Sequence, residues 1–313
     1  MITRWKRYLA PAVDTLVSKP HPARPSTLPA YPPKFEVLAG LLSDIGCYRA
    51  VNEDFYRYIK PEKREKLEQK GILTLVCDGM GGHAGGEIAS RLAAEIIVRT
   101  YYESMKPPQA ALEEAFEMAN RAVYKTARKQ PRLHGMGTTS TAMVIHDAAV
   151  ISAQVGDSRL YLVRSEQIYL MSEDHSAVME MVRRGMMSLE EARCHEDKNI
   201  ILRVVGVQPE VSVSTWKNSF PVRDGDCFVL CTDGLYDLVV DEEIKRTVSE
   251  HEAQSASQRL VALARERGGH DNITVCVIKI CTDRTATIAE KANMPPTREL
   301  KPLPLRLRTE TKE

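Results

Sequence analysis

The sequence lacks any long hydrophobic run, and no segment approaches the roughly 18 apolar residues that a membrane-spanning helix needs. We therefore expect no membrane span. The basic N-terminus, MITRWKRYLAPAV, contains no hydrophobic core segment of the kind found in secretory signals. Without such a signal, a cytoplasmic location is expected.

The sequence also lacks an excess of charge of either sign. Lys and Arg total 43 against 42 for Asp and Glu, which leaves a formal net charge of +1. Nucleic acids and anionic membrane surfaces attract proteins through clustered positive charge. The even balance therefore gives no reason to expect either partner.

Paired cysteines are absent as well, because the seven cysteines are scattered and none belongs to a Cys-x-x-Cys pair. This spacing argues against a zinc site and against a disulfide framework. Several cysteines lie inside apolar runs, which is typical of buried, reduced thiols in a cytosolic protein: Cys77, Cys227, Cys231 and Cys276.

Proline gathers at the two ends of the chain. Residues 1–34 are rich in proline, which has no backbone donor and fixes φ, so an extended and poorly ordered leader is expected there. Residues 283–313 form a similar polar, proline-containing tail. The globular part is therefore expected to span 35–282.

Hydrophobic periodicity divides the globular part into strands and groups of helices. Strands are expected at 35–45, 72–77, 138–145, 149–155, 159–163, 167–171, 211–216, 226–231 and 272–281. Helices are expected at 87–102, 109–128, 176–196, 235–240, 241–251 and 255–267, with 60–70 as a charged surface connection. Because strict βαβ alternation is absent, we predict an α+β fold with two packed sheets flanked by helices.

Several carboxylates share one context, in which an apolar strand meets a turn. Asp78 ends ILTLVC, Asp157 lies in VGDSR, Asp233 follows CFVLCT, Asp271 begins DNITV, and Asp54 would add a fifth. Taken singly, each acid is more often an ordinary turn residue. Strand ends meet at one rim of a sheet, however, and acids gathered there repel one another unless cations neutralise them. The joint pattern therefore indicates a metal site.

Oxygen ligands alone favour the hard cations Mg²⁺ and Mn²⁺ over zinc. Two such ions about 3.5–4 Å apart polarise a phosphoryl oxygen and activate a bridging water. Arg49 lies shortly before Asp54, and its planar fork suits a phosphate, although a lone arginine is more often a surface residue. An arginine beside a carboxylate-bound metal pair is an arrangement for hydrolysing phosphate esters.

A family resemblance rests on segments that occur in the family's order: RAVNED (49–54), CDGMGGHAGGEIAS (77–90), GTTSTAMV (137–144), VGDSRLYLV (155–163), EDHS (173–176), CTDGLYDLV (231–239) and GGHDNITV (268–275). On these segments the sequence resembles the metal-dependent Ser/Thr protein phosphatases, the protein phosphatase 2C-like family, in its bacterial form. The resemblance implies a four-layer α-β-β-α sandwich of two antiparallel sheets flanked by helices. It also implies a phosphatase domain at 35–282, with a helical flap at about 176–206.

The resemblance further implies a role for each matched acid. Asp78 would bridge two ions, Mn²⁺ or Mg²⁺, and the Gly79 carbonyl would help to bind one of them. Asp233 and Asp271 would complete the coordination of the first ion.

The remaining matched residues would surround that pair. Glu53 and Asp54 would serve the second ion, directly or through waters, and Asp157 with Asp233 would hold a weaker third ion. Arg49 would bind the substrate phosphate. Asn272 would orient the neighbouring acid or a metal-bound water.

The identity of the general acid stays open. Some relatives carry a histidine directly after the Asp-Gly pair, proposed to protonate the leaving alkoxide, whereas Met80 occupies that position here, as in bacterial members. His83 lies further along the same loop and is one candidate for proton transfer. A metal-bound water is the alternative acid, with His83 then only hydrogen-bonding within its loop.

These expectations combine into a monomeric, cytoplasmic, Mn²⁺- or Mg²⁺-dependent phosphatase of phosphoserine and phosphothreonine in proteins, opposed by a Ser/Thr kinase. A metal-bridging hydroxide would attack phosphorus in line, without a phosphoenzyme. No cysteine begins a C-x₅-R loop, so the cysteines are expected to be bystanders.

Three other interpretations of the sequence stay open. A catalytically dead, phosphoprotein-binding module on the same fold would be expected to lose the acids, which this chain keeps. A hydrolase of small phosphate esters would use the same site. Residues 79–84 also match G-x-G-x-x-A of dinucleotide-binding proteins, but Asp78 would repel the pyrophosphate, and two helices follow before the next strand.

Overall fold

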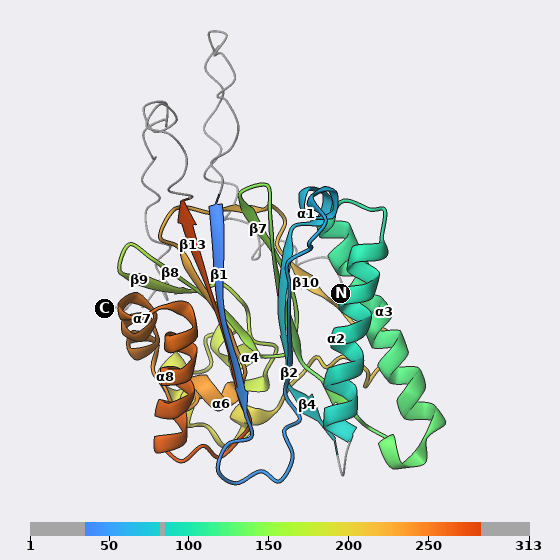
Figure 1. Cartoon of the computed structure of the whole chain (residues 1–313). Helices are drawn as coiled ribbons and strands as arrows, with labels where there is room; N and C mark the ends of the chain where they lie inside the picture. Colours follow the sequence, from blue (N-terminus) through green and yellow to red (C-terminus); the bar gives the residue numbers. More distant parts are fainter. Residues whose placement is uncertain (1–34, 82–84, 283–313) are drawn as a thin grey trace, which may run out of the picture. The chain divides into compact units, whose positions relative to one another are not determined.

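The computed structural model describes residues 35–81 and 85–282. The predicted leader (1–34), the predicted tail (283–313) and His83 lie outside the described residues. Two β-sheets form the centre, and helices cover the outer face of each (Figure 1). The predicted four-layer α-β-β-α sandwich is therefore confirmed.

One sheet has five strands in the order β1-β13-β12-β8-β9, and every neighbouring pair is antiparallel. Its members are β1 (Phe35–Asp44), β8 (Arg159–Arg164), β9 (Gln167–Leu170), β12 (Cys227–Cys231) and β13 (Ile273–Thr282). β1 and β13 pair along their whole length, from Phe35 opposite Thr282 to Asp44 opposite Ile273. The loop that follows β1 therefore lies beside the residues that precede β13.

The second sheet follows the order β10-β7-β6-β3-β2, with β11 also paired to β7, and it too is antiparallel. Its members are β2 (Phe55–Ile59), β3 (Ile72–Cys77), β6 (Ser140–His146), β7 (Ala149–Val155), β10 (Ser214–Thr215) and β11 (Phe220–Pro221). A separate pair joins β4 (Gly79–Met80) to β5 (Gly137–Thr138). Buried apolar residues of both large sheets, such as Val76 and Phe228, form one layer between them.

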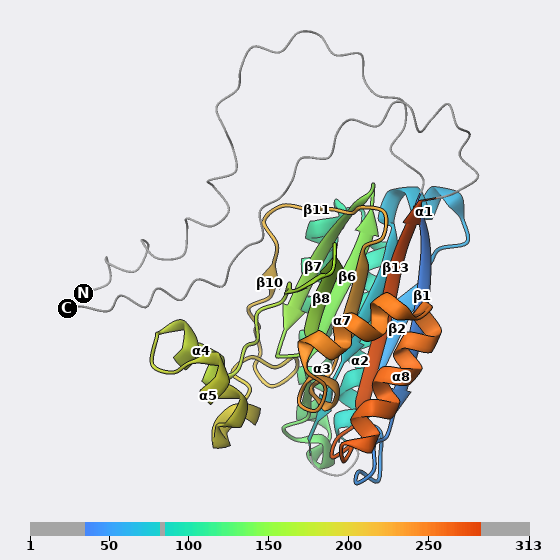
Figure 2. The ribbon, with the colours of Figure 1, turned by 90° about the vertical axis from the view of Figure 1, so that its left-hand side faces the viewer.

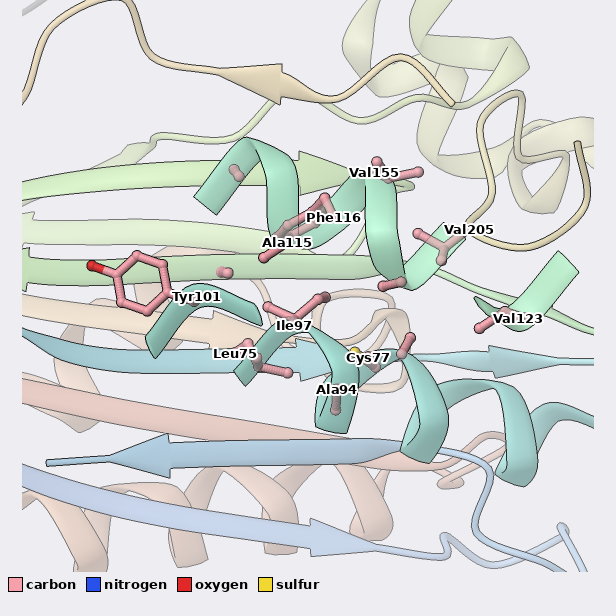
Figure 3. Close-up of a cluster of buried hydrophobic side chains, with 14 of the residues drawn as sticks. Leu75, Cys77, Ala94, Ile97, Tyr101, Ala115, Phe116, Val123, Val155 and Val205 are labelled. Carbon is pink, nitrogen blue, oxygen red and sulfur yellow. The ribbon is translucent and has the colours of Figure 1, made fainter. Parts of the chain in front are cut away.

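Helices α2 (Gly85–Glu103) and α3 (Pro108–Lys129) cover the six-stranded sheet, and α7 (Asp241–Glu250) and α8 (Ala253–Glu266) cover the five-stranded one. Figure 3 shows the first of these layers, where Ile97 of α2 lies close to Leu75 of β3 and Phe116 of α3 belongs to the same buried cluster. Small residues such as Ala94 and Ala115 on the buried faces allow the helices to approach each other and the sheet closely.

Most predicted elements are confirmed, with boundaries that differ by one to a few residues. The connection predicted at 60–70 is wrong in part, because α1 (Arg64–Lys70) forms there. Arg64 and Glu68 pair one helical turn apart, and the Lys70 amine donates to the Lys106 carbonyl. The strand predicted at 211–216 shrinks to β10, and β2 was not predicted.

The structure differs in detail from two further predictions, both about helices. The helix expected at 87–102 begins two residues earlier, because α2 already starts at Gly85. The helical stretch predicted at 176–196 divides into α4 (Ala177–Arg183) and α5 (Leu189–Cys194). Gly185, with φ of +69°, lies between them and ends the first helix.

Among the helices of the described residues, none is both long and apolar enough to cross a bilayer.

Candidate active site

The predicted acids all lie at strand ends, as the sequence indicated. Asp54 directly precedes β2 and Asp78 directly follows β3, and these antiparallel strands place Phe55 opposite Cys77. Asp233 starts α6 (Asp233–Tyr236) just after β12, and Asp271 lies just before β13, the strand that pairs with β12. Asp157 lies in the turn between β7 and β8. Residues from distant parts of the sequence are thereby brought to one place.

The carboxylates are close enough to perturb one another. Burial raises the pKa of Asp54 to about 7 and that of Asp233 to about 6. Burial, and then repulsion from Asp233, raise the pKa values of Asp78 and Asp157 well above the usual range. Asp271 adds to the repulsion at Asp54, Asp78 and Asp233. A cluster of this kind is what a divalent cation would neutralise.

Among the residues that the structure describes, two carboxylate oxygens in or beside this cluster find no hydrogen-bond partner. Glu53 Oε1 and Asp233 Oδ1 are both buried and unpaired in the described part of the chain. Buried polar atoms are almost always satisfied, so such oxygens suit an ion or its waters. No three His, Cys, Asp or Glu side chains among residues 35–81 and 85–282 are arranged to hold an ion as they stand. The residue-by-residue ligand assignments therefore stay predictions.

Glycines make room for Glu53, a role that the sequence did not reveal. The Gly79 N–H donates to the Glu53 carbonyl, with 3.2 Å between nitrogen and oxygen. A Cβ on Gly86, in the first turn of α2, would lie 2.4 Å from Glu53 Oε1. A Cβ on Gly79 would lie 2.2 Å from the Gly86 carbonyl oxygen. Because only glycine permits these approaches, the glycines pack the loop against Glu53 as well as allowing it to bend.

Threonines in or beside neighbouring strands hold two of the acids, Asp54 by its side chain and Asp78 by its backbone. The Thr232 hydroxyl donates to Asp54 Oδ2 at 2.8 Å. The Asp78 backbone N–H donates to the Thr139 hydroxyl at 3.0 Å, and the Asp78 carbonyl accepts from the Thr139 N–H at 2.9 Å and the Thr138 hydroxyl at 2.8 Å. These threonines were not predicted as positioning residues, although Thr138 and Thr139 lie in the matched segment GTTSTAMV and Thr232 lies in CTDGLYDLV.

Arg49 and Asn272 connect the loop after β1 to the residues before β13. Arg49 Nη2 lies 2.8 Å from Asp271 Oδ2, and the Asn272 N–H donates to the other Asp271 oxygen at 2.8 Å. The Asn272 side chain accepts from the Glu53 N–H at 2.8 Å and donates to the carbonyls of Ile45 and Val51. Asn272 thus fastens the loop that carries Arg49 and Glu53.

His175 is a structural residue. Its Nδ1 accepts from the Gly156 N–H at 3.0 Å, and its Nε2 lies 2.9 Å from the Ser214 hydroxyl. Burial and the nearby Arg203 lower the pKa of His175 to about 4, so the ring is neutral near pH 7. His175 therefore ties the turn that carries Asp157 to β10.

The predicted flap (176–206) contains α4, α5 and a 3-10 turn at Glu196–Asn199. Figure 2 shows these helices beside the two sheets. The flap has a small apolar core of Val178, Val182 and Ala192. Its Lys198 forms an ion pair with Asp237, which directly follows α6 and its first residue, Asp233. The flap is thus connected to the helix that begins at a predicted metal ligand.

Comparisons with known proteins agree with this geometry. The family model described as Protein phosphatase 2C matches residues 50–268. The serine/threonine phosphatase stp of Listeria innocua is 34% identical over 223 residues, which cover 68% of this chain and 86% of the relative.

Solved structures give the same result. The serine/threonine phosphatase PstP/Ppp of Mycobacterium tuberculosis superimposes with a TM-score of 0.68 at 32% identity, covering 78% of this chain and 98% of that one. The catalytic domain of the serine/threonine protein phosphatase PstP in complex with two manganese ions has a TM-score of 0.67 at 31% identity, covering 79% of this chain and 100% of that one. The chain therefore belongs to the protein phosphatase 2C family and is a serine/threonine protein phosphatase.

Proposed function

We propose that this chain hydrolyses phosphoserine and phosphothreonine in proteins with two Mn²⁺ or Mg²⁺ ions held at the acid cluster, and a weaker third ion between Asp157 and Asp233. The proposal rests on the buried, mutually repelling carboxylates and on the two unpaired oxygens of Glu53 and Asp233. When bound, the ions supply the positive charge and the activated water that phosphate-ester hydrolysis needs.

The residues of the chain would divide the remaining work. Arg49 is half-exposed, with 49% of its side chain accessible, so its fork can meet a phosphate from solvent while one nitrogen holds Asp271. Asn272 keeps Arg49, Glu53 and Asp271 in register through its backbone and side-chain hydrogen bonds. Thr232 fixes the orientation of the Asp54 carboxylate, and Thr139 fixes the backbone of Asp78, before substrate arrives.

The same proposal covers the organisation of the whole chain. A catalytic domain would span 35–282, with a leader at 1–34 and a tail at 283–313. The enzyme would act as a cytoplasmic monomer and reverse the action of a Ser/Thr kinase. Phosphorylated proteins would be its substrates, with the flap at 176–206 in contact with them.

The proposed function is tested by comparing hydrolysis of different classes of phosphate ester. Phosphate release would be measured from one peptide carrying phosphothreonine, phosphoserine or phosphotyrosine at the same position, and from a small sugar phosphate, each with Mn²⁺. We expect turnover of the phosphothreonine and phosphoserine peptides and little from the other two. Release from the sugar phosphate alone would favour a small-ester hydrolase. Tight binding of the phosphothreonine peptide without turnover would favour a catalytically dead, phosphoprotein-binding module.

A further inference from the structure

A groove opens beside the acid cluster, along β2 and the first turns of α2, two elements that lie next to each other in Figure 1. Its volume is about 510 Å³, and Val51, Phe55, Arg57 and Arg91 contribute to its lining. Of the predicted metal ligands in the described part of the chain, Asp54 alone lines it. The groove is therefore a separate space that shares one wall with the acid cluster.

Two arginines meet over one aromatic ring in this groove. The guanidinium carbon of Arg57, on β2, lies 4.1 Å from the centroid of the Phe55 ring, and that of Arg91, on α2, lies 4.7 Å from it. Stacking of a guanidinium on an aromatic face restrains its position without using its N–H donors. The ring thus holds two positive charges together next to the site of the reaction.

The present carboxylate partners of these arginines are weak. Arg57 Nη2 lies 3.8 Å from Glu95, and Arg91 Nη2 lies 3.6 Å from Glu87, which are long separations for an ion pair. All four side chains are between 37% and 53% accessible to solvent. Exposed pairs of this kind contribute little, because water screens them. A carboxylate presented by a bound molecule could therefore compete for both guanidiniums.

The backbone beside the groove suits an extended chain. In the described residues β2 ends its sheet, pairing with β3 and with no strand on its other side. A polypeptide can lie along such an edge. Arg57 lies three positions along the chain from Asp54, and three residue steps of extended backbone span roughly 10 Å, so three steps of an extended substrate would cover the same length.

We propose that the groove binds the segment of the phosphoprotein substrate next to the phosphorylated residue, and that Arg57 and Arg91 select an acidic side chain about three residues away from it. This selection rests on the proposed phosphatase function and adds a sequence preference to it. An arginine pair used only for the fold would bind no such segment and would give no preference.

The first test uses the unaltered enzyme with Mn²⁺. Two phosphothreonine peptides would differ only in Glu or Gln three residues from the phosphorylated position, in one pair on the N-terminal side and in another on the C-terminal side. We expect kcat/KM to be about three- to tenfold higher for the Glu peptide of one pair, the range that two exposed charge contacts provide. High salt should reduce this preference. Equal values for Glu and Gln peptides in both pairs would overturn the proposal.

The second test assigns the preference to the arginines. In the double variant Arg57→Gln, Arg91→Gln, the ratio of kcat/KM values for the Glu and Gln peptides should fall to about one. Arg99→Gln removes an exposed arginine of the same helix outside the groove, so it should keep the ratio. Glu95→Gln removes the competing carboxylate partner of Arg57 and should raise the Glu-to-Gln ratio of kcat/KM values. A double variant that keeps the full preference would contradict the assignment.

A measurement of peptide binding without turnover distinguishes a failure of the groove proposal from a failure of the proposed phosphatase function. Fluorescence anisotropy of labelled peptides on the Asp233→Asn protein measures affinity without turnover. If no peptide is hydrolysed by the unaltered enzyme, the phosphatase proposal fails, whereas a Glu-over-Gln difference in affinity would still support the groove. If hydrolysis occurs and neither affinity nor kcat/KM depends on the acidic residue, the groove proposal alone fails.

Discussion

Arg49 donates a hydrogen bond to Asp271, with 2.8 Å between Nη2 and Oδ2. The hydrogen bond to Asp271, together with that residue's negative charge, raises the pKa of Arg49 above its ordinary value and keeps the guanidinium charged. The residue predicted to bind phosphate and a residue predicted to bind metal thus form one unit. Binding of phosphate at Arg49 should therefore affect binding of metal at Asp271, and binding of metal should affect binding of phosphate.

Loss of the Arg49 fork should weaken substrate binding more than ion binding. For Arg49→Ala we expect kcat/KM for a phosphothreonine peptide to fall about 10- to 100-fold, since hydrogen bonds to charged groups contribute about 1.5–3 kcal/mol. Steady-state kinetics at saturating Mn²⁺ gives the value, and calorimetric Mn²⁺ titration provides the control. An unchanged kcat/KM in this variant would show that Arg49 does not bind the substrate phosphate.

Asp78→Asn and Asp233→Asn should each abolish turnover while leaving the fold intact. Each change removes a charge from the predicted ion ligands, and we expect kcat to fall by at least about a thousandfold. Asp147→Asn is a matched control, because Asp147 is an exposed turn residue with φ of 49°, a conformation that asparagine adopts readily. Circular dichroism checks the fold. Near-normal kcat in either site variant would show that the ligand assignment is wrong.

The stability of the metal-free protein should fall as pH rises. Burial raises the pKa of Asp54 to about 7 and that of Asp233 to about 6, whereas aspartate in an unfolded chain titrates near about 3.9. Between these values the folded protein holds more protons than the unfolded chain, so the stability contributed by these groups is complete below about pH 4 and is lost through pH 7.

Ions that neutralise the carboxylates should reverse this loss. The increase in Tm on adding Mn²⁺ should therefore be larger at pH 7.5 than at pH 5.5, measured by scanning fluorimetry against samples with EDTA. Asp233→Asn should flatten the metal-free pH profile, because one of the titrating groups is gone. An Mn²⁺-dependent gain that is the same at both pH values would argue against the cluster as the ion site.

An exposed methionine of the flap should contribute to protein substrates in particular. Met186 is 69% accessible, whereas Met187 packs against the small core of the flap, so Met186→Gln tests contact without unfolding the segment. We expect kcat/KM for a phosphoprotein to fall about threefold through lost apolar contact, with that for a small aryl phosphate unchanged. Met105→Gln, at a fully exposed methionine just after α2, is the control. Equal losses on both substrates would point to packing alone.

The fold was largely predictable from local pattern, because its strands are buried apolar runs and its covering helices carry clear apolar stripes. β3 and β7 were predicted with their observed boundaries. β2 was missed, since FYRYI mixes aromatic and charged residues and every position is half-buried. α1 was missed for a related reason: its highly charged sequence has no apolar stripe, and it is held by Lys70 and a surface ion pair.

Most acids of the site were also predictable, because Asp78, Asp157, Asp233 and Asp271 each lie beside a recognisable strand, whereas Asp54 precedes β2. What could not be predicted is how they are held. The contact of Thr232 with Asp54 joins residues 178 positions apart, and the space that Gly86 leaves for Glu53 depends on packing rather than on a local signal. The Arg49–Asp271 pair likewise depends on the full-length pairing of β1 with β13.

Metal-dependent turnover is the decisive measurement for the proposed ion site at the acid cluster. Hydrolysis of a phosphothreonine peptide would be followed for the unaltered protein after EDTA treatment and after Mn²⁺ is restored, beside Asp233→Asn under the same conditions. We predict that EDTA abolishes activity, that Mn²⁺ restores it fully, and that the variant stays inactive throughout. Activity that survives chelation, or an active Asp233→Asn protein, would show that hydrolysis does not depend on ions at this cluster.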